Sequence, residues 1–121
     1  MNKTCHVSEH EIINDEQFND MRDLLEDDFA DLIQTYITDS QARVEKLRHA
    51  HINNDNTSGF EIAHTLKGAS ASLGATLLMK LSGQFQEACR EHNIKDQAPL
   101  IERLSLAVQD VEREINRRLG Q

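Results

Sequence analysis

Apolar residues recur every three or four positions through most of this chain, and that spacing restricts its fold more than any other feature. It gives an α-helix one apolar face, whereas a half-buried strand requires strict alternation. One apolar stripe runs from Phe29 to Leu47, and another runs from Ile101 to Ile115. The 121 residues include one proline and only 4% aromatic residues, a composition that does not favour strands. The sequence therefore predicts an all-α protein with a single core.

Capping and turn residues divide the chain into one short and four long helical segments. The short segment begins at Asn14, which suits an N-cap, and ends near Glu26. We expect the long segments at about 28–50, 58–74, 76–92 and 99–118. Short polar loops between them favour an up-down-up-down antiparallel four-helix bundle with a short additional N-terminal helix. Residues 1–13 are interpreted as a flexible N-terminal tail, and residues 14–121 as a single helical bundle domain.

Local signals place three of the helix boundaries. Ser58 and Glu61 form a capping-box pattern that predicts the start of the second long segment. Gly74 is expected to end that segment in a left-handed conformation. Pro99 suits the first turn of the last helix, where a missing N–H costs nothing.

The formal net charge of −8 is unevenly distributed, because residues 9–31 hold ten acidic side chains and one basic one, Arg22. Such a surface repels nucleic acid. No run approaches the roughly 20 apolar residues of a membrane span, and the N-terminus lacks a secretory signal. Cys5 and Cys89 lack the spacing of a metal site, so we interpret them as reduced thiols without a chemical role. We expect a cytoplasmic protein without nucleic-acid or membrane partners.

Residues 63–75, AHTLKGASASLGA, place a histidine, a lysine and a glycine on one side of a predicted helix. At about 100° per residue, with His64 at zero, Lys67 lies at about −60° and Gly68 at about +40°, opposite the apolar positions. A glycine within a helix costs about 1 kcal/mol relative to alanine, so Gly68 requires a reason. The close approach of another surface is one. This arrangement suits an exposed nitrogen that receives a phosphoryl group from a docking partner.

The string from His64 to Gly68, HTLKG, followed by Gly74-Ala75, lies on the second long helix of a predicted four-helix bundle. With this motif in this position, the chain resembles the histidine-containing phosphotransfer (Hpt) domains of bacterial phosphorelays. The resemblance extends through the run from Leu24 to Val44, and it covers nearly the whole chain, about residues 15–118.

The resemblance implies a role for each matching residue. His64 would accept the phosphoryl group, Lys67 would stabilise its charge, and Gly68 would leave a gap for a receiver domain. Gln86, on the adjoining helix, would lie within reach of the imidazole or the phosphate. The chemistry agrees, because a histidine in water has a pKa of about 6.5 and is mostly neutral, hence nucleophilic, at cytoplasmic pH. Phosphoryl transfer then depends mainly on positioning and charge stabilisation.

The resemblance also implies the partners of this protein. The phosphoryl group would come from an aspartate in the receiver domain of a hybrid histidine kinase. It would pass reversibly to an aspartate in the receiver domain of a response regulator. The receiver would supply a divalent metal, Mg²⁺, so no intrinsic cofactor is expected. The chain has no nucleotide-binding loop, so we expect no autonomous kinase activity. The four predicted helices already complete the bundle core within one chain, so we expect a monomer.

Small and apolar residues surround the histidine on the predicted helix. If the helix is extrapolated through residue 75, Phe60, Ala71 and Ala75 lie within about 40° of His64. Together with Gly68 they would form a compact docking surface for a receiver domain. Phe60 has an alternative placement, folded back under the loop that precedes the helix.

Two other functions fit parts of the same pattern. A metal-binding bundle would use Glu61 and His64 as a Glu-x-x-His pair, but a di-iron site needs a second pair that the chain lacks. The tail residues Cys5, His6 and His10 could bind a metal only with a fourth ligand. The second alternative is a module that binds a receiver domain without phosphotransfer.

Overall fold

The computed structural model describes residues 11–120, and within them the chain forms helices and no strand. The helices, in chain order, are α1 (Asp15–Leu25), the 3-10 helix η1 (Glu26–Asp28), α2 (Phe29–Ile52), α3 (Asn56–Leu73), α4 (Thr76–Arg90), the 3-10 helix η2 (Ile94–Asp96) and α5 (Ala98–Arg118). The expected all-α fold is confirmed.

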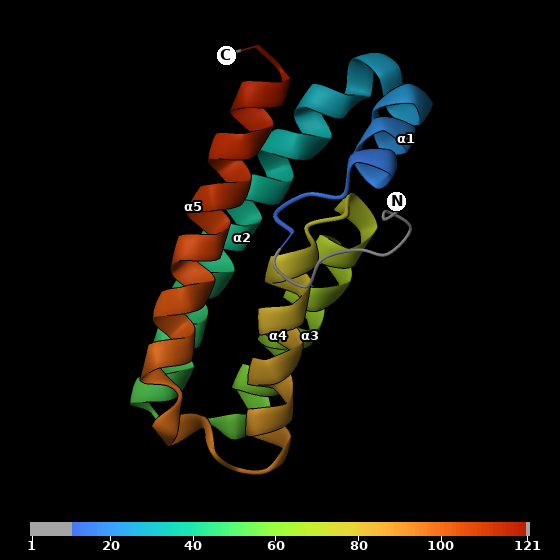
Figure 1. Ribbon diagram of the computed structural model, residues 1–121. Helices are drawn as coiled ribbons and strands as arrows, with labels where there is room; N and C mark the ends of the chain where they lie inside the picture. Colours follow the sequence, from blue (N-terminus) through green and yellow to red (C-terminus); the bar gives the residue numbers. More distant parts are fainter. Residues whose placement is uncertain (1–10, 121) are drawn as a thin grey trace.

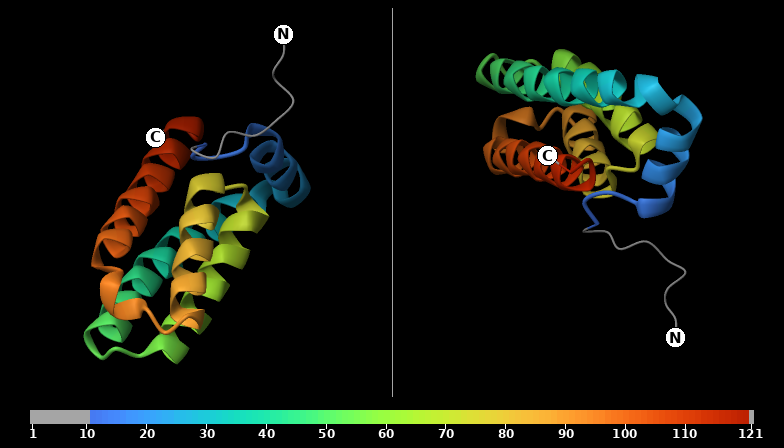
Figure 2. Two further views of the ribbon diagram at one scale, coloured as in Figure 1. Left: turned by 60° about the horizontal axis from the view of Figure 1, so that its bottom comes forward. Right: turned by 90° about the horizontal axis from the view of Figure 1, so that it is seen from above.

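The four long helices form an up-down-up-down bundle. Figure 1 shows α2 and α5 side by side, with α3 and α4 beside them, and each helix runs opposite to the one before it. The short helix α1 lies at one end of the bundle, against α2 and α3, as the views in Figure 2 also show. The predicted architecture, including the additional N-terminal helix, is therefore confirmed.

The apolar stripes predicted from the sequence face one another in the core. Leu47, Leu66, Phe85 and Leu104 come from the four long helices, and their side chains are fully buried. All six residues of the α2 stripe are buried, namely Phe29, Ile33, Tyr36, Ser40, Val44 and Leu47. The core therefore fixes which face of each helix points to solvent.

Two of the expected caps are present, one at the start of α1 and one at the end of α3. Asn14 Oδ1 accepts a hydrogen bond from the Gln17 backbone N–H at 2.9 Å, so the predicted cap of α1 is confirmed. Gly74 ends α3 with a left-handed φ of 86°, also as predicted. The helix α4 ends at Arg90, two residues before the expected position, and His92 adopts a positive φ of 60°.

The start of α3 differs from the prediction. The N-cap is Asp55, whose Oδ1 accepts a hydrogen bond from the Ser58 backbone N–H at 3.0 Å, while Oδ2 accepts one from Ser58 Oγ at 2.8 Å. Ser58 therefore lies inside the first turn and the predicted Ser58–Glu61 capping box is wrong. The Asp55 carboxylate takes the N–H group and the hydroxyl that the capping box would have used.

The segment before α1 is anchored to the turn between α3 and α4. The Leu77 N–H donates to the Glu11 carbonyl at 2.8 Å, the Asn14 N–H donates to the Gly74 carbonyl at 2.7 Å, and Ile13 is 3% exposed. The prediction of a flexible tail is therefore wrong for residues 11–13, because Ile13 is apolar enough to join the core. Residues 1–10 lie outside the described part of the chain.

None of the helices between residues 11 and 120 is both long enough and apolar enough to cross a membrane.

Candidate functional site

His64 projects from α3 into solvent. Its neighbours on the helix, Ala63, Leu66 and Ser70, are fully buried on the opposite face. The predicted orientation of His64, Lys67 and Gly68, which together with Ala71 we call the strip, is therefore confirmed. No residue in the described part of the chain donates to or accepts from the imidazole ring. Both ring nitrogens are therefore available to an incoming group.

Phe60, one turn before the histidine, is adjacent to the imidazole. The two rings are nearly parallel, at 3°, with their centroids 6.2 Å apart. Phe60 is half-buried, because its other edge packs against the core. The side chain thus forms an apolar wall on one side of His64, which agrees with its expected place on the docking surface.

Lys67 lies one turn after the histidine, on the side of α3 that faces α4. A Cβ atom placed on Gly83 of α4 would lie 3.4 Å from Lys67 Cδ, so the aliphatic stem of the lysine rests against this glycine. Over residues 11–120, no carboxylate forms an ion pair with the Lys67 ammonium group. Its charge therefore remains available to an anion next to His64, since residues at i and i+3 are neighbours on a helix surface.

Gly68 borders open space. A Cβ atom at this position would meet nothing within 4 Å, whereas one at Gly59 would lie 2.7 Å from both Cys89 Sγ and Ile94 Cδ1. Internal packing thus explains the glycine at position 59 but not the one at position 68. The open space above Gly68 fits a surface that another protein approaches closely.

The two alanines predicted for the docking surface differ in exposure. Ala71 is partly exposed on the same strip. Ala75 is fully buried, so its predicted place on the docking surface is wrong. The left-handed Gly74 ends α3, and the chain then turns so that the Ala75 N–H donates to the Ser70 carbonyl at 2.9 Å. An extrapolated helix cannot pass through such a turn.

Gln86 lies on α4 and is only 8% exposed. Its Oε1 atom has no hydrogen-bond partner in the described structure, and no hydrogen bond joins its side chain to His64. A buried amide oxygen without a partner is costly. The expected contact with the imidazole or the phosphate stays a prediction.

A buried pair of hydroxyl groups holds α3 against α2 behind the site. Tyr36 Oη and Ser70 Oγ are 2.9 Å apart, and burial raises the pKa of Tyr36 above its ordinary value. Sequence reasoning assigned Tyr36 to the core but did not identify this hydrogen bond. It also missed Gly83, although a glycine in the middle of a predicted helix is the same signal that drew attention to Gly68.

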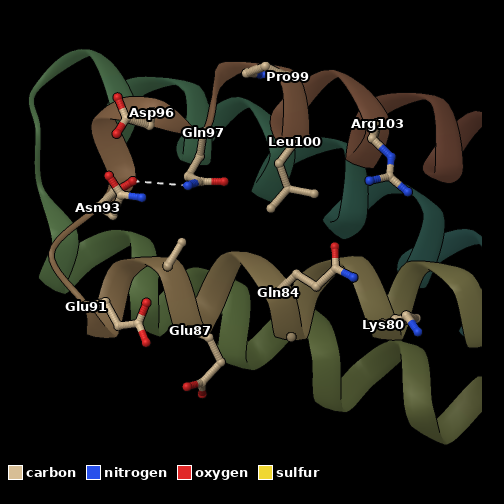
Figure 3. A pocket seen from close by; sticks show the side chains of 12 residues that line it. Lys80, Gln84, Glu87, Glu91, Asn93, Asp96, Gln97, Pro99, Leu100 and Arg103 are labelled. Carbon is tan, nitrogen blue, oxygen red and sulfur yellow. Dashed lines mark hydrogen bonds between the residues drawn. The ribbon is translucent and has the colours of Figure 1, made fainter.

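His64 lines neither of two grooves in the bundle. One, of about 440 Å³, is formed by α1, α2 and α3 and is lined by apolar residues such as Leu25, Leu32 and Leu73. The other, of about 720 Å³, separates α4 from α5, and Figure 3 shows Lys80 and Gln84 on one side of it with Leu100 and Arg103 on the other. No residue of α3 lines this second groove.

Metal ligands do not gather in the described part of the chain. No group of three or more histidine, cysteine, aspartate or glutamate side chains there could hold a metal ion. Cys5, His6 and His10, the other candidates, lie outside these residues.

Comparisons with known proteins agree with the resemblance seen in the sequence. The profile of the Hpt domain family matches residues 31–114, well over half of the chain. The fold is similar to that in the crystal structure of histidine-containing phosphotransfer protein B (HptB) from Pseudomonas aeruginosa PAO1, with a TM-score of 0.86 and 24% identity. That match covers 90% of this chain and 95% of HptB. No curated protein sequence matches the chain. The chain therefore belongs to the Hpt domain family, whose members carry out histidine phosphotransfer in phosphorelays and interact there with receiver domains.

Proposed function

We propose that His64 is the residue that carries the phosphoryl group, accepting it from the aspartate of one receiver domain and passing it reversibly to that of another. The observation that carries this proposal is the exposed imidazole on α3, without an internal hydrogen-bond partner over residues 11–120 and opposite a buried apolar face. A nucleophile in this position needs no rearrangement of the bundle to meet a partner.

The proposed transfer begins with the unprotonated nitrogen of neutral His64. This nitrogen attacks the phosphorus of the partner's aspartyl phosphate, so that an N–P bond forms as the O–P bond to aspartate breaks. The aspartate leaves as a carboxylate, and the proton on the other ring nitrogen is released to solvent. The reverse sequence, with the aspartate of a second receiver as nucleophile, returns the imidazole to its neutral form.

Lys67 would stabilise the charge that this reaction brings to the site. A phosphoryl group carries about −1.5 to −2 charges near neutral pH, while the chain as a whole carries −8. An ammonium one helical turn from the ring offsets part of that repulsion. The divalent metal, Mg²⁺, would be supplied by the receiver, and we propose no cofactor of the chain itself.

The surface around His64 would form the docking site. Gly68 would allow close approach, Ala71 adds little bulk, and Phe60 offers an exposed apolar edge. Gln86 would donate a hydrogen bond to the imidazole or the phosphate after a small movement of its buried side chain. The orphaned Oε1 atom supports such a movement, because its present position leaves it without a partner among the described residues.

The partners in this proposal are the receiver domain of a hybrid histidine kinase, as donor, and the receiver domain of a response regulator, as recipient. The protein would act as a monomer in the cytoplasm, without nucleic-acid or membrane partners and without kinase activity of its own. The acidic surface of α1 and η1 supports the exclusion of nucleic acid.

A labelling experiment tests the proposal. The purified chain is incubated with a receiver domain that carries a radioactive aspartyl phosphate, and it should acquire an acid-labile, alkali-stable label. His64→Gln should abolish the label, whereas His49→Gln, which alters another exposed histidine on a long helix, should retain it. ATP alone should give no label.

Two outcomes contradict the proposal. A folded His64→Gln variant that labels like the wild type would place the phosphoryl group elsewhere. A wild-type chain that binds the receiver but never acquires label would favour the alternative, a binding module without phosphotransfer.

A further inference from the structure

Gly83 interrupts the middle of α4, where nothing in the backbone requires a glycine. Glycine is one of the weakest helix formers, and position 83 is seven residues from either end of α4. Apart from the backbone of α4 itself, the described residues place one atom within 4 Å of a Cβ atom here, Lys67 Cδ at 3.4 Å. The position of the missing side chain is thus next to the stem of the lysine of the proposed site.

We propose that Gly83 is a positioning residue for phosphotransfer, because it provides the seat on which the Lys67 stem lies and so directs the ammonium group toward His64. This inference rests on the proposed function, in which Lys67 stabilises the phosphoryl group. A free lysine side chain samples many rotamers, and packing its methylene groups against a neighbour restricts them. The charged end stays in solvent while the stem is held.

The contacts of Lys67 support this role. The lysine is half-buried although it lies on the exposed side of α3, and it forms no ion pair with the described residues that could hold it in place. Packing against α4 is then what orients it. Gly83 also lines the groove between α4 and α5 seen in Figure 3, so a long unbranched side chain could turn away from the lysine into that space.

Valine at position 83 tests the contact with Lys67 better than a long unbranched side chain, which could turn away into the groove. It carries two methyl groups on Cβ, and no single rotation turns both away from the Lys67 stem. Gly83→Ala is the matched control, because its Cβ would make only an ordinary contact at 3.4 Å. Both residues form helices better than glycine, so neither is expected to weaken α4 itself.

The test measures the rate of phosphoryl transfer from a phosphorylated receiver at saturating receiver concentration, for the wild type, Gly83→Ala, Gly83→Val, Lys67→Ala and the double variant Gly83→Val/Lys67→Ala. We expect Gly83→Val to slow transfer at least about threefold and Gly83→Ala to stay within about twofold of the wild type. In the Lys67→Ala background, Gly83→Val should add no further loss, because its effect passes through the lysine.

A slow Lys67→Ala together with a fully active Gly83→Val would overturn this inference alone. Equal slowing by Gly83→Val in both backgrounds would also overturn it, since that pattern reports a general effect on packing. A wild-type rate for Lys67→Ala would remove the charge role in the proposed function, and this inference with it.

NMR relaxation of the lysine side chains provides a second measurement that needs no variant to fold. In the wild type, the Lys67 methylene groups should be more restricted than those of Lys46, an exposed lysine of α2. Equal mobility of the two side chains would contradict the proposed seat.

Discussion

At the scale of single residues, three glycines within helices have three different surroundings. The side chain missing from Gly59 would collide with Cys89 and Ile94, and that missing from Gly83 would touch Lys67. The one missing from Gly68 would meet only solvent. Since a glycine weakens a helix, each of these positions needs a reason. Packing in the core explains Gly59, whereas no contact among the described residues explains Gly68.

Two substitutions of Gly68 distinguish its effect on protein stability from its effect on receiver docking. We expect Gly68→Ala to raise the free energy of unfolding by about 0.5–1 kcal/mol, because alanine favours the helix and has room. The longer side chain of Gly68→Gln should reduce receiver affinity and slow transfer by about tenfold or more, because it occupies the space that the receiver enters. Denaturant unfolding and transfer kinetics measure the two effects.

Gly59→Ala is the matched control for stability. Its Cβ would lie 2.7 Å from two core atoms, so we expect a loss of about 1–3 kcal/mol. A receiver affinity of Gly68→Gln equal to that of the wild type would contradict the docking role of Gly68.

At the scale of helices, α1 is held at the end of the bundle by contacts with α3 and α5. Gln17 Nε2 donates to the Ala71 carbonyl at 3.1 Å, which joins α1 to α3. Arg118 of α5 forms an ion pair with Asp15, and its guanidinium carbon lies 5.2 Å from the centre of the Phe18 ring. Glu114 accepts a hydrogen bond from Arg118 Nε at 2.8 Å and orients this side chain. The end of α5 thus anchors α1.

The Glu114 carboxylate should make stability depend on acid pH. Hydrogen bonds from Arg117, and then from Arg118, lower the pKa of Glu114 from 4.5 to about 2. Because the folded-state pKa lies below the ordinary value of the unfolded chain, the contribution is complete above about pH 4.5 and is lost as the pH falls toward 2. We expect about 1 kcal/mol or less at neutral pH, as for other ion pairs near the surface.

Thermal unfolding followed by circular dichroism across this pH range checks the expectation. Glu114→Gln should melt below the wild type at pH 7 and approach it as the pH falls toward 2. Melting curves that stay equally far apart at every pH would show that Glu114 acts through packing rather than through its charge.

At the scale of the whole molecule, the bundle has buried its apolar stripes and leaves His64 exposed on α3. Among residues 11–120, the large apolar side chains most exposed to solvent are Leu24, Ile52 and Leu106, which belong to three different helices. Scattered apolar residues of this kind do not form the continuous patch that stable dimers use. The strip around His64 therefore stays open to a partner.

We accordingly expect a monomer. Light scattering after size-exclusion chromatography should give the mass of one 13.8 kDa chain at micromolar concentration, with or without a phosphoryl group. A mass of two chains that falls to one on dilution would contradict this expectation, because part of the exposed surface would then bind a second copy of the chain.

Some of the sequence-based predictions were wrong because more than one nearby residue can form the same local structure, such as a helix cap. Asp55 and Ser58 both lie near the start of α3 and both can cap a helix, and the sequence pattern alone does not rank them. The structure selects Asp55, whose carboxylate satisfies both the backbone N–H and the hydroxyl of Ser58. The helical angle predicts the direction of a side chain only as far as the helix extends, and α3 ends at Gly74, so it does not apply to Ala75.

The sequence by itself determined the helical segments and the strip that presents His64, Lys67 and Gly68, because a helix repeats every 3.6 residues and its apolar face must be buried. Only the tertiary structure decided which glycine supports the lysine and how the segment at residues 11–13 is anchored. These contacts join parts of the chain that are far apart in sequence, Lys67 with Gly83 and Glu11 with Leu77. Periodicity says which way a side chain points, but the packing of the helices decides what it meets.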